Sequence, residues 1–261
     1  MARVIAIANQ KGGVGKTTTA INLGACIAAR GRRVLLIDID PQGNATSGLG
    51  IEKRDDRKSV YDVIIEGMSI TEALISIENS RLHLCPSDMR LAGAEIELVS
   101  MMSRENRLKS SLEKIADDYD YIMIDCPPSL GLLTLNSLTA ADTVLVPIQC
   151  EYYALEGLSQ LMNTIKLVKK HLNRELEIEG VVLTMFDGRT NLSVQVVDEV
   201  RKHFSSKVFK TVIPRNVKLS EAPSHGLPII DYAGSSKGAE AYIELAEELI
   251  RYSEKKRLRR R

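Results

Sequence analysis

The sequence lacks tryptophan and has few other aromatic side chains, with 3 phenylalanines and 8 tyrosines among 261 residues. Proteins that bind single-stranded nucleic acid stack the bases on aromatic side chains, so this scarcity argues against such a surface. If the protein binds nucleic acid, the phosphate backbone is the expected target.

Long apolar runs and paired cysteines are also missing. No segment approaches the run of about eighteen apolar residues that a membrane span needs, and residues 4–8 are too short for the apolar core of a signal peptide. Cys26, Cys85, Cys126 and Cys150 lie far apart, without a Cys-x-x-Cys pair, which argues against a zinc ribbon. A chain of this length also buries a sufficient core without disulfides. We therefore expect a cytoplasmic protein with reduced thiols.

The net charge is small, +1, but it is unevenly distributed along the chain. Six of the residues in 255–261 are lysine or arginine, so the rest of the chain has a net charge of −5 once these six are removed from +1. This segment is suited to DNA phosphates, to anionic lipid or simply to keeping the chain soluble. Leu258 is the only apolar residue among the last eight, which leaves little to insert into lipid. We expect one domain over residues 1–252 and a basic tail over residues 253–261.

Short apolar runs rich in β-branched residues alternate with longer segments of helical periodicity. This alternation predicts an α/β fold with a doubly wound, mostly parallel β-sheet and helices on both faces. The expected strands are residues 4–8, 33–37, 81–85, 121–125, 143–148, 179–185 and 208–213. The expected helices are residues 17–30, 155–172, 191–204 and 237–252. Residues 43–80 and 86–117 are expected to add to the helical faces.

A glycine-rich segment, residues 11–18, follows the first expected strand and precedes a helix. Its glycines allow consecutive backbone N–H groups to point at one anion, and the helix N-terminus adds its dipole. The common phosphate-loop pattern needs glycine where this chain has Gln10, so the segment matches a variant with an extra lysine. The strand, loop and helix together predict a P-loop NTPase. The expected nucleotide-binding residues here are Lys11, Gly12, Gly13, Val14, Gly15, Lys16, Thr17 and Thr18.

The two lysines of this segment have different expected roles. Lys16 is placed to reach the β- and γ-phosphates of a nucleotide, and the Thr17 hydroxyl to ligate Mg²⁺. Lys11 is either a solvated loop lysine or a cation that reaches the nucleotide of a neighbouring subunit, as an arginine finger does.

Aspartates follow two of the expected strands. Asp38 and Asp40 lie at the end of the second strand and share a face by the two-residue period of a strand. Asp125 ends the apolar run 121–124, as in the Walker B strand that binds magnesium opposite the Thr17 hydroxyl. A lone aspartate at a strand end is more often a helix cap, but two such ends beside a phosphate loop favour a metal site.

Residues 11–18, 38–43 and 122–128 together resemble the deviant Walker A ATPases. Within that group the chain resembles the ParA/Soj proteins of chromosome and plasmid partition. Residues 40–46 and 221–226 also look like that branch, and the resemblance covers nearly the whole chain.

The resemblance implies an ATPase that binds ATP with Mg²⁺ and forms a homodimer around two nucleotides. In such proteins the lysine matching Lys11 reaches the phosphates of the partner subunit. The aspartate matching Asp40 positions or activates the attacking water, and the one matching Asp38 lies near the magnesium. The expected catalytic residues are therefore Lys11, Lys16 and Asp40, and the expected metal ligands are Thr17, Asp38 and Asp125.

The resemblance also implies the adenine contacts and the partners. Residues matching Pro214 and Asn216 contact the adenine, with Met185 nearby. The ATP-bound dimer of such proteins binds double-stranded DNA without sequence preference, which would place it on the nucleoid. Arg189 and Lys218 are the expected DNA-binding residues. A ParB-type partner stimulates hydrolysis through a basic N-terminal segment and releases the dimer.

Two other functions are alternatives to a partition ATPase. The first is a membrane-associated positioning ATPase like the related MinD proteins, which bind anionic lipid through a C-terminal amphipathic helix. The weakly apolar tail argues against it, and we expect no stable membrane association. The second is a redox ATPase like nitrogenase iron protein, in which cysteines of two subunits hold a metal cluster. The spacing of Cys85 and Cys126 does not match that arrangement.

Overall fold

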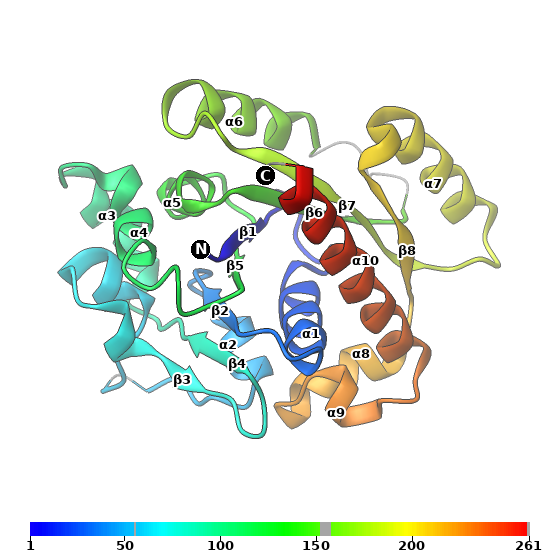
Figure 1. The fold of residues 1–261 in the computed structure, drawn as a ribbon, viewed down its shortest axis with the longest axis horizontal. Coiled ribbons are helices and arrows are strands. Elements are labelled where there is room, and N and C mark those ends of the chain that lie inside the picture. The colour runs from blue at the N-terminus through cyan, green and yellow to red at the C-terminus, as the bar shows by residue number, and fades with distance from the viewer. Residues whose placement is uncertain (55, 152–157, 260–261) are drawn as a thin grey trace.

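The computed structural model describes residues 1–54, 56–151 and 158–259, and within them one eight-stranded sheet has helices on both faces (Figure 1). The strand order is β3-β4-β2-β5-β1-β6-β7-β8. Neighbouring strands are parallel except the short β3, which runs antiparallel to β4. The strands are β1 (Arg3–Ile7), β2 (Val34–Asp38), β3 (Ile75–Ser76), β4 (Leu82–Cys85), β5 (Tyr121–Asp125), β6 (Thr143–Gln149), β7 (Glu177–Phe186) and β8 (Val208–Pro214).

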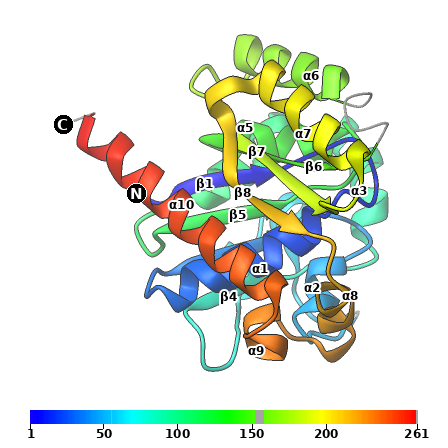
Figure 2. The same cartoon turned by 90° about the vertical axis from the view of Figure 1, so that its right-hand side faces the viewer.

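The helices form two layers, one on each face of the sheet (Figures 1 and 2). One buried layer includes residues of α3, α4, α5, α6 and α7, and the other includes residues of α1, α9 and α10. The helices are α1 (Lys16–Ala29), α2 (Asn44–Gly48), α3 (Leu91–Val99), α4 (Arg107–Leu112), α5 (Leu132–Ala140), α6 (Leu158–His171), α7 (Asn191–Phe204), α8 (Val217–Glu221), α9 (Ile229–Ala233) and α10 (Lys237–Arg259).

The strand β1 shows why the sheet needs both layers. Val4 and Ala6 pack into one buried layer, whereas Ile5 and Ile7 pack into the other. Successive side chains of a strand point to opposite faces, so a strand that is apolar at every position must be covered on both. β1 lies between β5 and β6, and the chain winds away from it in both directions. Ligands of such sheets bind at the carboxyl ends of the strands near this point.

The predicted fold class is confirmed, and each expected strand is present with ends that differ by one or two residues at most. Two expectations need correction. Residues 75 and 76 form β3 at the edge of the sheet and do not add to a helical face. The last helix, α10, does not end at Tyr252 but continues to Arg259 and projects beyond the body (Figure 2). Residues 155–157 of an expected helix lie outside the described residues.

Among the helices that the structure describes, none combines the length and the apolar character that crossing a membrane requires.

Candidate nucleotide-binding site

The loop between β1 and α1 has the backbone shape that an anion site requires. Gly13 and Gly15 have φ values of 72° and 87°, which side chains with a Cβ rarely adopt. Gly15 is the N-cap of α1, and no side chain of the described residues caps that helix. The first N–H groups of α1 are therefore open to an anion such as a phosphate. The loop predicted from residues 11–18 is confirmed in its place between strand and helix.

Lys16 is the first residue of α1 and is almost fully buried. Its Nζ donates a hydrogen bond to the backbone carbonyl of Lys11 at 3.1 Å, across the loop. Burial lowers the pKa of Lys16, while the negative charges of Asp125 and Asp40 act in the opposite direction. The ammonium group thus bonds the loop and lies within the electrostatic influence of the carboxylates. The side chain of Lys11 is only partly buried, and its Nζ makes no hydrogen bond or ion pair within the described part of the chain.

The carboxylate of Asp125 is the most unusual group of the site. Asp125 pairs in register with Ile7 on β1 and with Asp38 on β2, so the ends of three strands meet here. It is fully buried, and neither of its oxygens has a hydrogen-bond partner among the described residues. Burial raises the pKa of Asp125, and the neighbouring Asp38 raises it further. The Thr17 hydroxyl lies near enough to lower this pKa without meeting the geometry of a hydrogen bond.

A buried carboxylate without partners is costly unless a cation or a proton satisfies it. Carboxylate and hydroxyl oxygens are the ligands that Mg²⁺ prefers. Asp125 and Thr17 therefore fit a magnesium ion held beside the phosphate loop.

Asp38 differs from Asp125 because its oxygens already have partners. Oδ2 accepts the backbone N–H and the hydroxyl of Thr46, both at 2.7 Å, and Oδ1 accepts the N–H of Asp40 at 3.3 Å. Burial raises the pKa of Asp38 to about 6, and the bonds from Thr46 oppose that rise. Asp40 is nearly buried, and its Oδ1 accepts the N–H of Gln42 at 2.9 Å. The structure thus brings Asp38, Asp40 and Asp125 together near Lys16.

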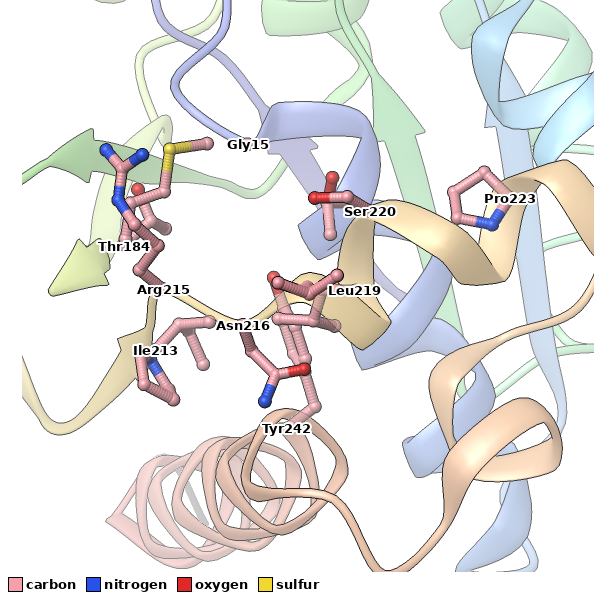
Figure 3. Close-up of a pocket in the computed structure, with 13 residues that line it drawn as sticks. Gly15, Thr184, Ile213, Arg215, Asn216, Leu219, Ser220, Pro223 and Tyr242 are labelled. Carbon is pink, nitrogen blue, oxygen red and sulfur yellow. The ribbon is translucent and has the colours of Figure 1, made fainter.

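A cavity of about 480 Å³ opens beside the loop, with walls formed by α1, β7, β8, α8 and α10 (Figure 3). This volume is within the range of about 300–1,000 Å³ for small-molecule sites. Five of the predicted nucleotide-binding residues line it, namely Gly15, Thr18, Met185, Pro214 and Asn216. The amide oxygen of Asn216 is buried without a hydrogen-bond partner among the described residues and lies near Gly238.

Other residues of the cavity wall escaped the sequence analysis. Thr184 lines the cavity, and its hydroxyl donates to the Val14 carbonyl at 2.8 Å, so β7 and the loop are tied together. Met185, which was predicted, has a φ of 51°, a strained backbone of the kind that collects at functional sites. Arg215 lies between the predicted Pro214 and Asn216, a position that would have pointed to it. The remaining wall residues that were missed are Ile213, Val217, Leu219, Ser220, Pro223 and Tyr242.

Arg189 and Lys218, the predicted DNA-binding residues, lie outside the cavity wall. Arg189 is strongly exposed, and its guanidinium donates to both oxygens of Asp187 at 2.8 and 2.6 Å. These bonds lower the pKa of Asp187 to about 2. Lys218 is paired with Glu221 at 2.8 Å. Both cations are therefore on the surface, each beside one carboxylate.

A family model described as an AAA domain matches residues 2–178 of the chain. The sporulation initiation inhibitor protein Soj of Bacillus subtilis is 63% identical over 249 residues, which cover 95% of this chain and 98% of that protein. The chromosome partitioning protein ParA of Myxococcus xanthus is 56% identical, and the match covers 99% of this chain and 92% of that protein.

A solved structure of a similar protein contains a nucleotide analogue and magnesium. The crystal structure of cobyrinic acid a,c-diamide synthase from Mycobacterium smegmatis, with a bound ATP analogue and magnesium, has a TM-score of 0.86 and 40% sequence identity to this chain. The match covers 97% of this chain and 96% of that one. From the two relatives and the family model, the chain belongs to the ParA/Soj family of chromosome-partitioning ATPases.

Proposed function

We propose that the chain is a magnesium-dependent ATPase that dimerises around ATP, binds double-stranded DNA without sequence preference in that state, and leaves DNA when a ParB-type partner stimulates hydrolysis. The observation that carries the proposal is the buried carboxylate of Asp125, which has no hydrogen-bond partner among the described residues and lies beside Lys16 and the phosphate loop. The proposal places the ATP-bound form on the nucleoid, in the cytoplasm.

Each part of the nucleotide has a matching feature. The open N–H groups of the loop, Gly12 to Thr18, and the Lys16 ammonium bind the phosphates. The cavity binds the base, with Asn216 and Pro214 against the adenine and Met185 beside it. Magnesium, when bound through Thr17 and Asp125 with Asp38 close by, supplies charge neutralisation at the phosphates. The fully bonded oxygens of Asp38 suit a supporting position better than direct ligation.

Hydrolysis requires a water aligned with the terminal phosphate and cations that neutralise developing charge. Asp40 lies next to the metal site, is itself nearly buried, and is the residue proposed to orient that water. Lys11 is proposed to reach the phosphates of the partner subunit, since its Nζ has no partner among the described residues of its own chain. Under this arrangement a monomer lacks one cation, so hydrolysis depends on dimerisation.

The same arrangement makes the nucleotide a switch. The γ-phosphate favours the dimer because both subunits contact it, and hydrolysis removes that contact. A dimer presents Arg189 and Lys218 twice, and phosphates of DNA compete with Asp187 and Glu221 for them. Exposed ion pairs contribute about 1 kcal/mol or less, so DNA phosphates can displace these carboxylates. ATP-gated DNA binding follows from the doubling of a modest basic surface.

The test is DNA retention by the purified protein with ATP, with ADP and without nucleotide, each with and without a ParB-type protein. We expect retention with ATP alone, loss of retention at raised salt, and release together with faster hydrolysis when the partner is added. Vesicles of anionic phospholipid are tested in parallel with DNA, because they offer negative charge without nucleic acid. Equal retention in all nucleotide states would contradict the switch, and ATP-dependent retention on vesicles without DNA binding would favour the MinD-like alternative.

A further inference from the structure

The hydroxyl groups of Thr46 and Ser87 connect Asp38 and Asp40 to α2 and to the segment after β4. Thr46, on α2, donates its hydroxyl to Asp38 Oδ2 at 2.7 Å and accepts the backbone N–H of Ser87 at 2.9 Å. Ser87 donates its own hydroxyl to the backbone carbonyl of Asp40 at 2.7 Å. The N–H of Asp40 donates to Asp38 at 3.3 Å, which closes the cycle.

The four residues of this cycle are buried, and the donor and the acceptor of each hydrogen bond are determined. The four residues are at most 7% exposed, so water does not readily replace a lost partner. A hydroxyl has one proton to donate. The Thr46 hydroxyl donates its proton to Asp38, so its oxygen accepts the backbone N–H of Ser87. The Ser87 hydroxyl donates its own proton to the Asp40 carbonyl.

Ser87 itself lies on a segment that is held from outside the site. The next residue, Asp88, accepts the hydroxyl of Ser59 at 2.6 Å and the guanidinium of Arg90 at 2.6 Å. Arg90 also bonds Asp62 at 2.7 Å. The bonds of Asp88 and Arg90 therefore fix the segment between β4 and α3, and Ser87 on this segment bonds the loop of Asp40.

We propose that Ser87 and Thr46 are positioning residues for ATP hydrolysis, which set the place of Asp40 by holding its backbone from the β4–α3 side. This rests on the proposed function, in which Asp40 orients the attacking water. Misplacement of a reacting group by 1 Å can cost about 100-fold in rate. Neither residue lines the cavity or belongs to the phosphate loop, so we expect their substitution to change hydrolysis more than nucleotide binding.

The first test compares Ser87→Ala with the wild type. The substitution removes one hydroxyl, while the Asp40 carbonyl keeps its bond from the Gly43 N–H at 2.8 Å, so we expect the variant to fold. We expect the kcat of ATP hydrolysis to fall about 10- to 100-fold and the affinity for ATP to change by less than about threefold. The matched control is Ser193→Ala, which removes another buried hydroxyl that donates to a backbone carbonyl, that of Cys150 at 3.3 Å. We expect this control to keep the wild-type kcat.

Variants of Thr46 test the other half of the cycle. Thr46→Ser keeps the hydroxyl and should retain most of the kcat, whereas Thr46→Val keeps the shape, loses the hydroxyl and should lose activity as Ser87→Ala does. Equal kcat values for these two variants, both folded by circular dichroism, overturn the role of the Thr46 hydroxyl. Ser87→Ala keeps the proposal testable if Thr46→Val does not fold.

A double variant separates positioning from general structural damage. If Ser87 acts through Asp40, then adding Ser87→Ala to Asp40→Ala causes no further loss of hydrolysis. A further loss that multiplies the two single effects overturns the proposal. Wild-type kcat in Ser87→Ala with an inactive Asp40→Ala overturns positioning but leaves the proposed function intact. Wild-type hydrolysis in Asp40→Ala instead removes the proposed role of Asp40 itself.

Discussion

Lys16 is the residue on which nucleotide binding most depends. Its ammonium is nearly buried and bonds only the carbonyl of Lys11 among the described residues, so a phosphate would replace a neutral acceptor with a charged one. We expect Lys16→Ala to weaken ATP binding by about 100-fold or more, measured with a fluorescent ATP analogue. Lys166→Ala, which removes an exposed lysine of α6, is the control and should bind as the wild type does. Near-normal affinity in Lys16→Ala would refute the assignment of the phosphate loop.

The cysteines lead to a prediction about thiol reactivity. All four are free and buried, and burial raises the pKa of Cys26, Cys126 and Cys150 to about 12 and that of Cys85 as well. The thiolate is the reactive form, and a raised pKa keeps these groups as thiols at neutral pH. We expect iodoacetamide at pH 8 to leave the native protein unmodified and to alkylate every cysteine in denaturant, read by mass spectrometry. Rapid alkylation of one native cysteine would show a reactive thiol that the structure does not explain.

Sequence reasoning located the residues whose chemistry is tied to a local pattern. Lys16, Thr17 and Asp125 lie at fixed positions relative to the end of a strand or the start of a helix. The motif spacing therefore predicts that they lie close together at the phosphate loop. Tyr242 and Ser87 could not be predicted in this way. Tyr242 reaches the cavity wall from α10, and Ser87 reaches Asp40 from the loop after β4. Only the packing of distant segments brings them there, and no local pattern marks it.

At the scale of elements, the length of a segment decided how well it was predicted. The long helices α1, α6, α7 and α10 repeat their apolar spacing over several turns, and the sequence indicated all of them. α2, α8 and α9 have five residues each, too few for a helical period to show. β3 has two residues and exists because β4 offers it an edge, so only the folded sheet reveals it.

The loop between β7 and α7 provides a prediction for DNA binding. Arg189 is held there by Asp187, and DNA phosphates must compete with that carboxylate. We expect Arg189→Ala to weaken retention of DNA by the ATP-bound protein and to make it less sensitive to salt, and Asp187→Ala to strengthen retention. ATP-dependent dimerisation should be unchanged in both.

Filter binding over a series of salt concentrations measures these effects. The control is Arg174→Ala, an exposed arginine in the loop after α6. Loss of dimerisation in Arg189→Ala would mean that the residue is structural, and equal DNA retention by Asp187→Ala and the wild type would mean that the ion pair does not restrain it.

At the scale of the whole molecule, the near-neutral charge and the single sheet bear on how the proposed dimer would bind DNA. The chain has a net charge of +1, and the described residues form one sheet with both faces covered, so no separate DNA-reading unit is seen among them. A weakly basic surface gains affinity when it is presented twice, because the effective concentration of the second contact is high. Dimerisation is therefore the step that would convert a weak binder into an ATP-gated one.

The trans role of Lys11 can be tested by mixing two inactive variants. Lys11→Ala should bind ATP within about threefold of the wild type but fail to hydrolyse it, because its own loop and Lys16 are intact and the charge-neutralising cation is missing. Asp40→Ala should bind ATP and remain a dimer, because the γ-phosphate persists. In a mixed dimer, the subunit with Lys11→Ala retains Asp40 and receives Lys11 from its partner, so one of the two sites is complete. With random pairing of equal amounts, half of the dimers are mixed and the rate should recover to roughly a quarter of the wild-type value. No recovery, in mixtures shown by light scattering to form dimers with ATP, would mean that Lys11 acts within its own subunit and that hydrolysis does not need the partner.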